Sequence, residues 1–133
     1  MIDAVWYLFR DVVYSGDLIE AERLLDQNPS LRISRNGIGE TVLHFLAVEN
    51  DLRSVSWLHA YGFSLDEQNE FGTPILFEVA QLEYRELFIW FLENGADPHK
   101  KDREGNDLIA YLHEYQKHEM ASFAFDAISA NKF

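Results

Sequence analysis

Residues 39–72, GETVLHFLAVENDLRSVSWLHAYGFSLDEQNEFG, decide the fold because they contain one full period of a repeat. Gly39 and Gly72 bound this stretch, and Gly105 follows at the same 33-residue step. Further positions keep that step: Leu43, Leu76 and Ile109; Ala47 and Ala80; Leu58 and Phe91; Gly62 and Gly95. A period shared by several positions is typical of a solenoid, in which similar units stack on one another.

Each unit has the same order of polar and apolar segments. A polar tip ends in a glycine, which tolerates a positive φ, and a short apolar helix, a break and a second helix follow. Thr41 is placed to cap one first helix, and Pro74 suits the first turn of another. Gly62 and Gly95 stand where a left-handed residue ends a second helix. The expected first helices are 41–49, 74–82 and 108–115, and the expected second helices are 53–61 and 85–94.

The two ends of the chain carry divergent copies of the unit. Residues 4–15 and 18–27 are expected to form the opening helix pair, which ends at Asn28-Pro29 because proline cannot continue a helix. Residues 118–129 are the expected last helix. Divergent ends are expected because terminal units must present one face to water. We predict one all-α domain, a solenoid of about four helix-turn-helix units with short hairpin-like tips, with unit boundaries near 1–34, 35–67, 68–100 and 101–133.

These residues resemble the ankyrin repeat family. Gly39-Glu-Thr-Val-Leu-His44, followed by Ala47 and Asn50-Asp51, is similar to that family's signature G-x-T-P-L-H…A…G-H. Residues 95–102 look like its junction between repeats. The resemblance covers essentially the whole chain as four units.

The resemblance also carries expectations about function, although a shared fold does not fix a function. It implies a scaffold that binds other proteins through its tips and the exposed side of each first helix. It also implies that His44 hydrogen-bonds the tip backbone. Val42 stands where the family has proline, and Phe77 stands where it has histidine. Small free-standing members are often bacterial, and some resemble immunity proteins that block a cognate toxin.

The charge of the chain bears on its partners. Acidic residues outnumber basic ones by 23 to 11, which gives a formal net charge of −12. This charge repels nucleic acid and anionic membranes and attracts a basic protein, although it also simply serves solubility. The apolar run at 4–9 is too short for a signal peptide or a membrane helix. We therefore expect a cytoplasmic protein, monomeric alone, with another protein as its partner and neither nucleic acid nor membrane.

The chain contains no motif that points to catalysis. Cysteine is absent, and neither a G-x-S-x-G nucleophile elbow nor a phosphate-binding loop occurs. His113 and His118 are five residues apart and are expected on different helix faces, while His59 and His99 are expected at the surface. We therefore predict that the chain is not an enzyme and holds no cofactor or metal.

The spacing of the repeat predicts a binding face made of tip residues and of the exposed side of the first helices. Its candidate partner-binding residues are Ile38, Glu40, Phe45, Glu49, Glu70, Phe71, Glu78, Leu82, Arg103, Tyr111, Glu114 and Tyr115. Ile38 and Phe71 are apolar at tip positions, which is typical of a binding hot spot unless they fold back onto a neighbouring unit. Trp6, Trp57 and Trp90 are instead expected to pack between units.

Two functions remain open on this pattern. The first is a non-catalytic module that occupies a surface on a partner protein, including an immunity-type inhibitor of a basic toxin. The alternative is a structural or assembly subunit of a larger complex, in which Phe123 and Phe125 on the outermost helix form an interface.

Overall fold

The structure, a computed structural model, describes residues 4–131, and this part of the chain is all-helical, as predicted. The longest helix has 14 residues, and none in the described range is long and apolar enough to cross a membrane. The elements are α1 Ala4–Ser15, α2 Leu18–Gln27, the 3-10 turn η1 Pro29–Arg32, α3 Val42–Val48, α4 Leu52–Ala60, α5 Ile75–Gln81, α6 Arg85–Glu93, α7 Leu108–Glu114 and α8 His118–Asn131.

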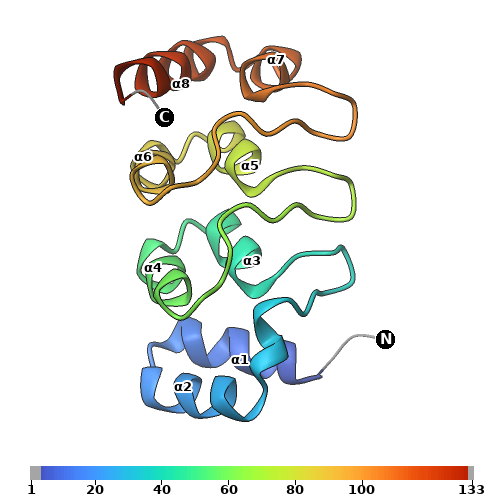
Figure 1. Ribbon diagram of the computed structural model, residues 1–133, viewed down its shortest axis with the longest axis vertical. Coiled ribbons are helices and arrows are strands. Elements are labelled where there is room, and N and C mark those ends of the chain that lie inside the picture. Colours follow the sequence, from blue (N-terminus) through green and yellow to red (C-terminus); the bar gives the residue numbers. More distant parts are fainter. Residues whose placement is uncertain (1–3, 132–133) are drawn as a thin grey trace.

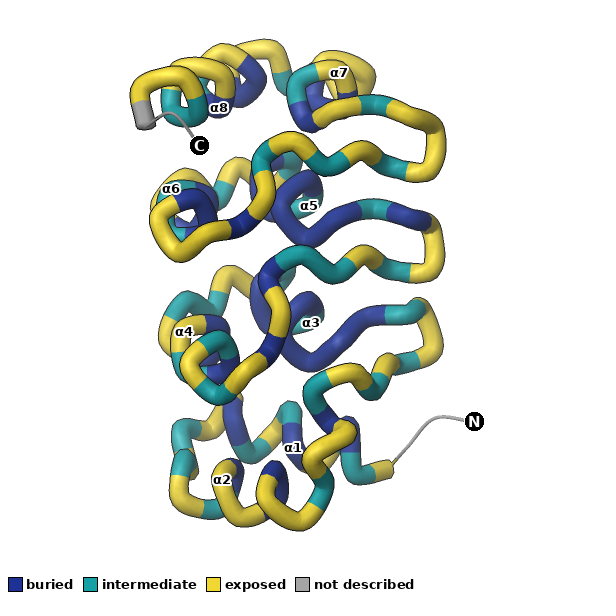
Figure 2. Tube along the Cα trace, viewed as in Figure 1, coloured by how far each residue is buried: buried dark blue, intermediate teal, exposed yellow. Residues whose placement is uncertain are grey.

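The helices form pairs that stack along the long axis of the molecule (Figure 1). The two helices of each pair contact one another, and the first helices α1, α3, α5 and α7 contact in succession. The tips project from one side of this stack, beyond the first helices, while α2, α4, α6 and α8 lie on the other side. Figure 2 shows the buried segments running between the two columns of helices and the exposed segments at the tips and outer turns.

The core is continuous between units because large rings reach across the unit boundaries. Phe9 of α1 stacks on Phe63, which follows α4, with ring centroids 5.9 Å apart. The ring centroids of Trp57 and Phe9 are 6.3 Å apart. The ring of Trp90 meets that of His59 in the preceding unit edge-on, with centroids 5.7 Å apart. The prediction that the tryptophans pack between units is therefore confirmed for these two. It is also confirmed for Trp6, which is fully buried and whose ring centroid lies 5.8 Å from that of Phe45 on α3.

Helix ends follow the repeat closely, within one or two residues of the predicted ranges. Thr41 accepts a hydrogen bond from the backbone N–H of His44, so it caps α3 as predicted. Pro74 precedes α5 at the N-cap position and does not lie in the first turn. The turn after each first helix uses a left-handed residue. It is Gly16 after α1, and Asn50, Glu83 and Gln116, again 33 residues apart, after α3, α5 and α7. Gly62 and Gly95 are also left-handed, as predicted.

The last helix closes the stack with one ring packed and one ring exposed. Phe123 lies 6.2 Å from Phe88 of α6, and the guanidinium of Arg85 lies 4.7 Å from its centroid. Phe125 is 59% exposed. Phe123 is therefore part of the packing between units, and Phe125 alone of the two faces water.

Candidate partner-binding surface

Each tip is held in shape by one side chain at its first turn. The Oδ1 atom of Asn36 accepts hydrogen bonds from the backbone N–H groups of Ile38 and Glu40, at 3.1 and 2.9 Å. Asn69 and Asp102 do the same in the next two tips. These three residues lie 33 apart and form a repeat column that the sequence analysis missed, although it is visible in the spacing. The tips are therefore built alike and carry their side chains in register.

Neighbouring tips are also joined to one another. The backbone N–H of Glu70 donates to the carbonyl of Ile38 at 3.1 Å. Arg35 donates to the carbonyls of Gly39 and Gln68, at 2.7 and 2.8 Å, and so ties its own tip to the next one. Backbone and guanidinium contacts together make the first two tips one connected surface.

Arg103 makes the corresponding connection between the last two tips. Its guanidinium donates to the backbone carbonyl of Glu70 in the preceding tip. Arg103 was predicted as a partner-binding residue, and it is exposed. Its guanidinium is held by this hydrogen bond, so Arg103 contributes to the order of the tips as well as to their surface.

Two apolar side chains project from these ordered tips. Ile38 is 47% exposed and Phe71 is 60% exposed, so neither folds back onto a neighbouring unit. They occupy the same repeat position, and Glu104 occupies it in the last tip. Glu70 is also exposed, next to Phe71. The tips thus present apolar groups to water at positions where a polar residue would be solvated more favourably.

The exposed side of the first helices adds a second row. Glu49, Leu82 and Tyr115 follow α3, α5 and α7 at the same repeat position and are all exposed. Leu82 is 42% and Tyr115 50% exposed. We call the tips together with the exposed side of these three helices the candidate face. The remaining predicted residues on it are Phe45 and Glu78, which are half-buried, and Glu114, which is exposed.

Two residues predicted on this face are buried, which corrects the prediction. Glu40 is 5% exposed and its carboxylate accepts a hydrogen bond from the Asn36 amide at 3.1 Å. Tyr111 is also 5% exposed, because its ring packs 5.1 Å from Phe77 and its hydroxyl donates to Gln81 at 2.7 Å. Both residues support the face from beneath.

Comparison with known proteins identifies the repeat. Residues 43–92 match the family model for ankyrin repeats. These matched residues are ankyrin repeats. A segment of 88 residues, 65% of the chain, is 34% identical to the E3 ubiquitin-protein ligase XBAT32 of Arabidopsis thaliana, and the match spans 17% of that ligase. Ankyrin repeats are typically non-enzymatic modules that bind other proteins.

The ankyrin histidine makes a different contact from the one that the resemblance implied. The Nε2 atom of His44 lies 2.7 Å from a carboxylate oxygen of Glu78 in the next unit, not at the tip backbone. The Asn69 amide donates to the same oxygen at 3.0 Å. His44 is therefore connected to Asn69 of the neighbouring tip through the carboxylate of Glu78.

Glu40, His44 and Glu78 are also the residues that come nearest to a metal-binding arrangement in the described part of the chain. One ligand atom from each lies within 4.8 Å of the others. The amides of Asn36 and Asn69 already donate to the two carboxylates, and the imidazole pairs with Glu78. Each of the three side chains therefore has a hydrogen-bond partner within the protein, while the Nδ1 atom of His44 has none.

Burial of Glu40 has a consequence for stability. Burial raises the pKa of the Glu40 carboxyl above its ordinary value of 4.5, and the hydrogen bond from Asn36 offsets only part of this effect. The folded state therefore holds the proton more tightly than the unfolded chain does. Stability contributed by the protonated carboxyl is present at low pH and is lost as the pH rises through the raised pKa.

We expect Glu40→Gln to be more stable than wild type above this pKa and to lose that advantage toward pH 4.5, because an amide has no proton to lose. Urea unfolding of both proteins between pH 4.5 and about pH 8 measures the difference. Glu93→Gln, at an exposed site on α6, is the control. A difference between Glu40→Gln and wild type that stays constant with pH would contradict the assignment to Glu40.

Two other histidine predictions also change. The Nδ1 atoms of His113 and His118 lie 2.7 Å apart, although they were expected on different helix faces. The left-handed Gln116 reverses the chain between α7 and α8, so the two residues do not share one helix. His59 is half-buried against Trp90, while His99 is exposed as predicted.

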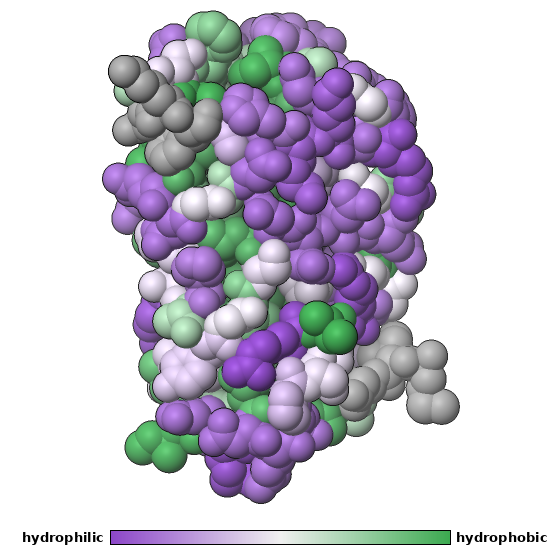
Figure 3. Space-filling model, in the orientation of Figure 1, coloured by the Kyte–Doolittle hydropathy of each residue, from purple (hydrophilic) through white to green (hydrophobic). Residues whose placement is uncertain are grey.

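The charge on the candidate face is mostly negative along the helices. Helices α3, α5 and α7 contain no lysine or arginine. Glu49, Glu78 and Glu114 contribute carboxylates to this side. Figure 3 shows hydrophilic residues over much of the visible surface, with hydrophobic groups as separate spots. The face therefore combines carboxylates with single apolar groups.

Proposed function

We propose that this chain is a non-catalytic module that acts by occupying a surface on a partner protein, with its four units working as one domain. The observation that carries the proposal is the exposure of Ile38, Phe71, Leu82 and Tyr115 on one connected, otherwise polar surface. Exposed apolar and aromatic groups at a rigid polar surface match the composition of protein-binding hot spots.

The partner in this proposal is a basic protein. The net charge of −12 and the absence of lysine and arginine from α3, α5 and α7 favour a positively charged surface opposite them. An immunity-type inhibitor that covers a basic toxin is one form of this function. The association rate is expected to fall steeply with salt, since attraction between exposed charges is screened.

We expect a Phe71→Ala, Leu82→Ala, Glu49→Lys variant to bind the partner at least about tenfold more weakly than wild type, because it removes two exposed apolar contacts and reverses one charge. The immobilised chain captures its partner from a lysate of the source cell, and mass spectrometry identifies it. Calorimetry with the purified partner then gives the dissociation constants.

The control is an Ile19→Ala, Phe125→Ala, Glu93→Lys variant, which changes the same kinds of residue on α2, α8 and α6. Ile19 is 87% exposed and Phe125 59%, so truncation leaves the core intact. We expect this variant to bind as wild type does. Equal affinity of the first variant and wild type, with both folded by circular dichroism, would rule out the candidate face as the binding surface.

A further inference from the structure

Several hollows among the described residues combine aromatic rings with carboxylates, and two of them differ in whether a cation lies over the rings. The first holds about 350 Å³ and lies between α1 and α3, lined by Arg10, Asp11, Tyr14, Phe45, Leu46 and Glu49. The second holds about 270 Å³ and lies beside α7 and the last tip.

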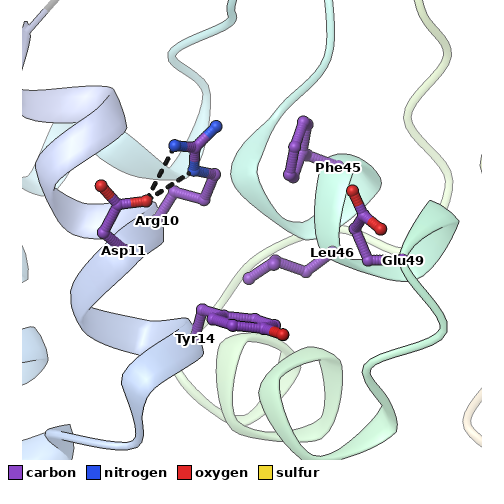
Figure 4. A pocket seen from close by; sticks show the side chains of 6 residues that line it. All are labelled: Arg10, Asp11, Tyr14, Phe45, Leu46 and Glu49. Atoms are coloured by element: carbon purple, nitrogen blue, oxygen red, sulfur yellow. Dashed lines mark hydrogen bonds and ion pairs between the residues drawn. The ribbon is translucent and has the colours of Figure 1, made fainter.

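The first hollow contains a cation supplied by the chain itself. The guanidinium of Arg10 lies 4.9 Å from the ring centroid of Phe45 and 5.1 Å from that of Tyr7. It also donates two hydrogen bonds to one carboxylate oxygen of Asp11, at 2.9 and 2.8 Å. Figure 4 shows this pair on α1 facing Phe45 and Glu49 on the α3 side. A ring and a carboxylate together hold a desolvated cation more strongly than either does alone.

The second hollow has rings and carboxylates of the same kinds. Phe71, Tyr111 and Tyr115 line it, and the two tyrosine rings are 4.7 Å apart. Glu104 and Glu114 lie at its walls. Burial raises the pKa of Tyr111, so its ring stays a neutral phenol whose hydroxyl is occupied by Gln81.

This hollow holds no cation over its rings among the described residues. Arg103 does line it, but its guanidinium donates to the carbonyl of Glu70 in the preceding tip. The lining contains three carboxylates but only that one guanidinium; the carboxylates belong to Asp102, Glu104 and Glu114. The side-chain amide of Asn106 donates a hydrogen bond to a carboxylate oxygen of Glu114 at 3.0 Å, which holds this carboxylate in place. The hollow is therefore an aromatic and acidic site whose charge is not balanced within its lining.

We propose that this hollow, which we call the cation pocket, receives one lysine or arginine side chain of the protein partner. The proposal rests on the proposed function, because it assigns one contact within the binding of a basic partner. The volume of about 270 Å³ lies below the roughly 300–1,000 Å³ of small-molecule sites, which suits a single side chain. The cation would lie over the exposed rings of Phe71 and Tyr115, with the buried Tyr111 beneath them, and the carboxylates would neutralise its charge.

The test uses blocked amino acids as probes of the full chain. Nα-acetyl-arginine methylamide and Nα-acetyl-lysine methylamide are titrated into isotope-labelled protein and followed by NMR. Nα-acetyl-citrulline methylamide, which has nearly the shape of the arginine probe and no charge, is the comparison. We expect at least one cationic probe to saturate, with a dissociation constant on the order of millimolar and with shifts centred on Phe71, Tyr111 and Tyr115. The citrulline probe is expected to produce no saturating shifts.

Two variants separate the rings from the charges. Tyr115→Ala removes an exposed ring and is expected to weaken the binding of the cationic probes about three- to tenfold. Glu114→Gln keeps the shape of the side chain but removes its charge, and is expected to weaken this binding about threefold. Tyr14→Ala removes a 62% exposed ring at the first hollow and is expected to leave probe binding unchanged. Since Glu114→Gln is nearly isosteric, it remains informative if Tyr115→Ala does not fold.

The proposal is overturned if the citrulline probe binds as well as the arginine probe. It is also overturned if the cationic probes shift NMR signals evenly across the acidic surface, and if Tyr115→Ala and Glu114→Gln, when folded, do not change those shifts. Either result rules out the cation pocket. The proposed function stays in place if the affinity for the captured partner still depends on Phe71, Leu82 and Glu49. Probe binding at the pocket without any effect of those residues on partner affinity removes the proposed face. It also removes the assignment of the pocket to the partner, because Phe71 belongs to both.

Discussion

Replacement of Phe77 by alanine is expected to lower the free energy of unfolding by about 3–5 kcal/mol. The ring is fully buried in α5, which contacts both α3 and α7, so the cavity opens at the centre of the stack. The substitution also removes the ring against which Tyr111 packs, with ring centroids 5.1 Å apart. Solenoid stability depends on contacts between neighbouring units, so a central cavity weakens two interfaces.

Urea unfolding followed by circular dichroism measures this loss. Phe125→Ala is the matched control, because it removes the same ring from a site that is 59% exposed, and a change within about 0.5 kcal/mol is expected. Similar losses for the two variants would show that the ring of Phe77 does not support the central interfaces. Separate transitions by different probes would show that the units unfold independently, in which case each transition is analysed separately.

The Phe77 site also shows how far the sequence predicts the fold. The period of 33 residues predicted the helix pairs, their order and their ends within one or two residues, because glycines and caps recur with it. It did not predict the burial of Tyr111. Phe45, Glu78 and Tyr111 share one repeat position, yet the first two are half-buried and the third is buried. Exposure there depends on the neighbouring unit, where Phe77 replaces the family's histidine.

The candidate site was predicted less completely than the fold for a similar reason. Periodicity places residues on a face, and Ile38, Phe71 and Leu82 were found exposed there. It does not show which polar groups pair across units. The contact of His44 with Glu78 and that of Arg103 with the carbonyl of Glu70 join residues about one repeat apart, and their geometry depends on how the tips stack.

Replacement of Gly39 by alanine is expected to destabilise the protein by about 2–5 kcal/mol, the sum of a backbone and a steric contribution. Gly39 has a φ of +77°, where an L-residue is strained by about 1–2 kcal/mol. An added Cβ would also lie 2.5 Å from the backbone nitrogen of Glu70. That nitrogen donates to the carbonyl of Ile38, so the clash separates two tips that the backbone joins.

Gly105→Ala isolates the backbone contribution. Gly105 has a φ of +84°, and a Cβ there meets nothing within 4 Å, so only the strain of about 1–2 kcal/mol is expected. Urea unfolding of both variants gives the difference, and equal losses would mean that the contact between tips adds nothing to stability. Because Ile38 and Phe71 lie in the tips that the clash separates, Gly39→Ala is also expected to weaken partner binding more than Gly105→Ala does. The same structural feature thus links the stability of the stack to the order of the candidate face.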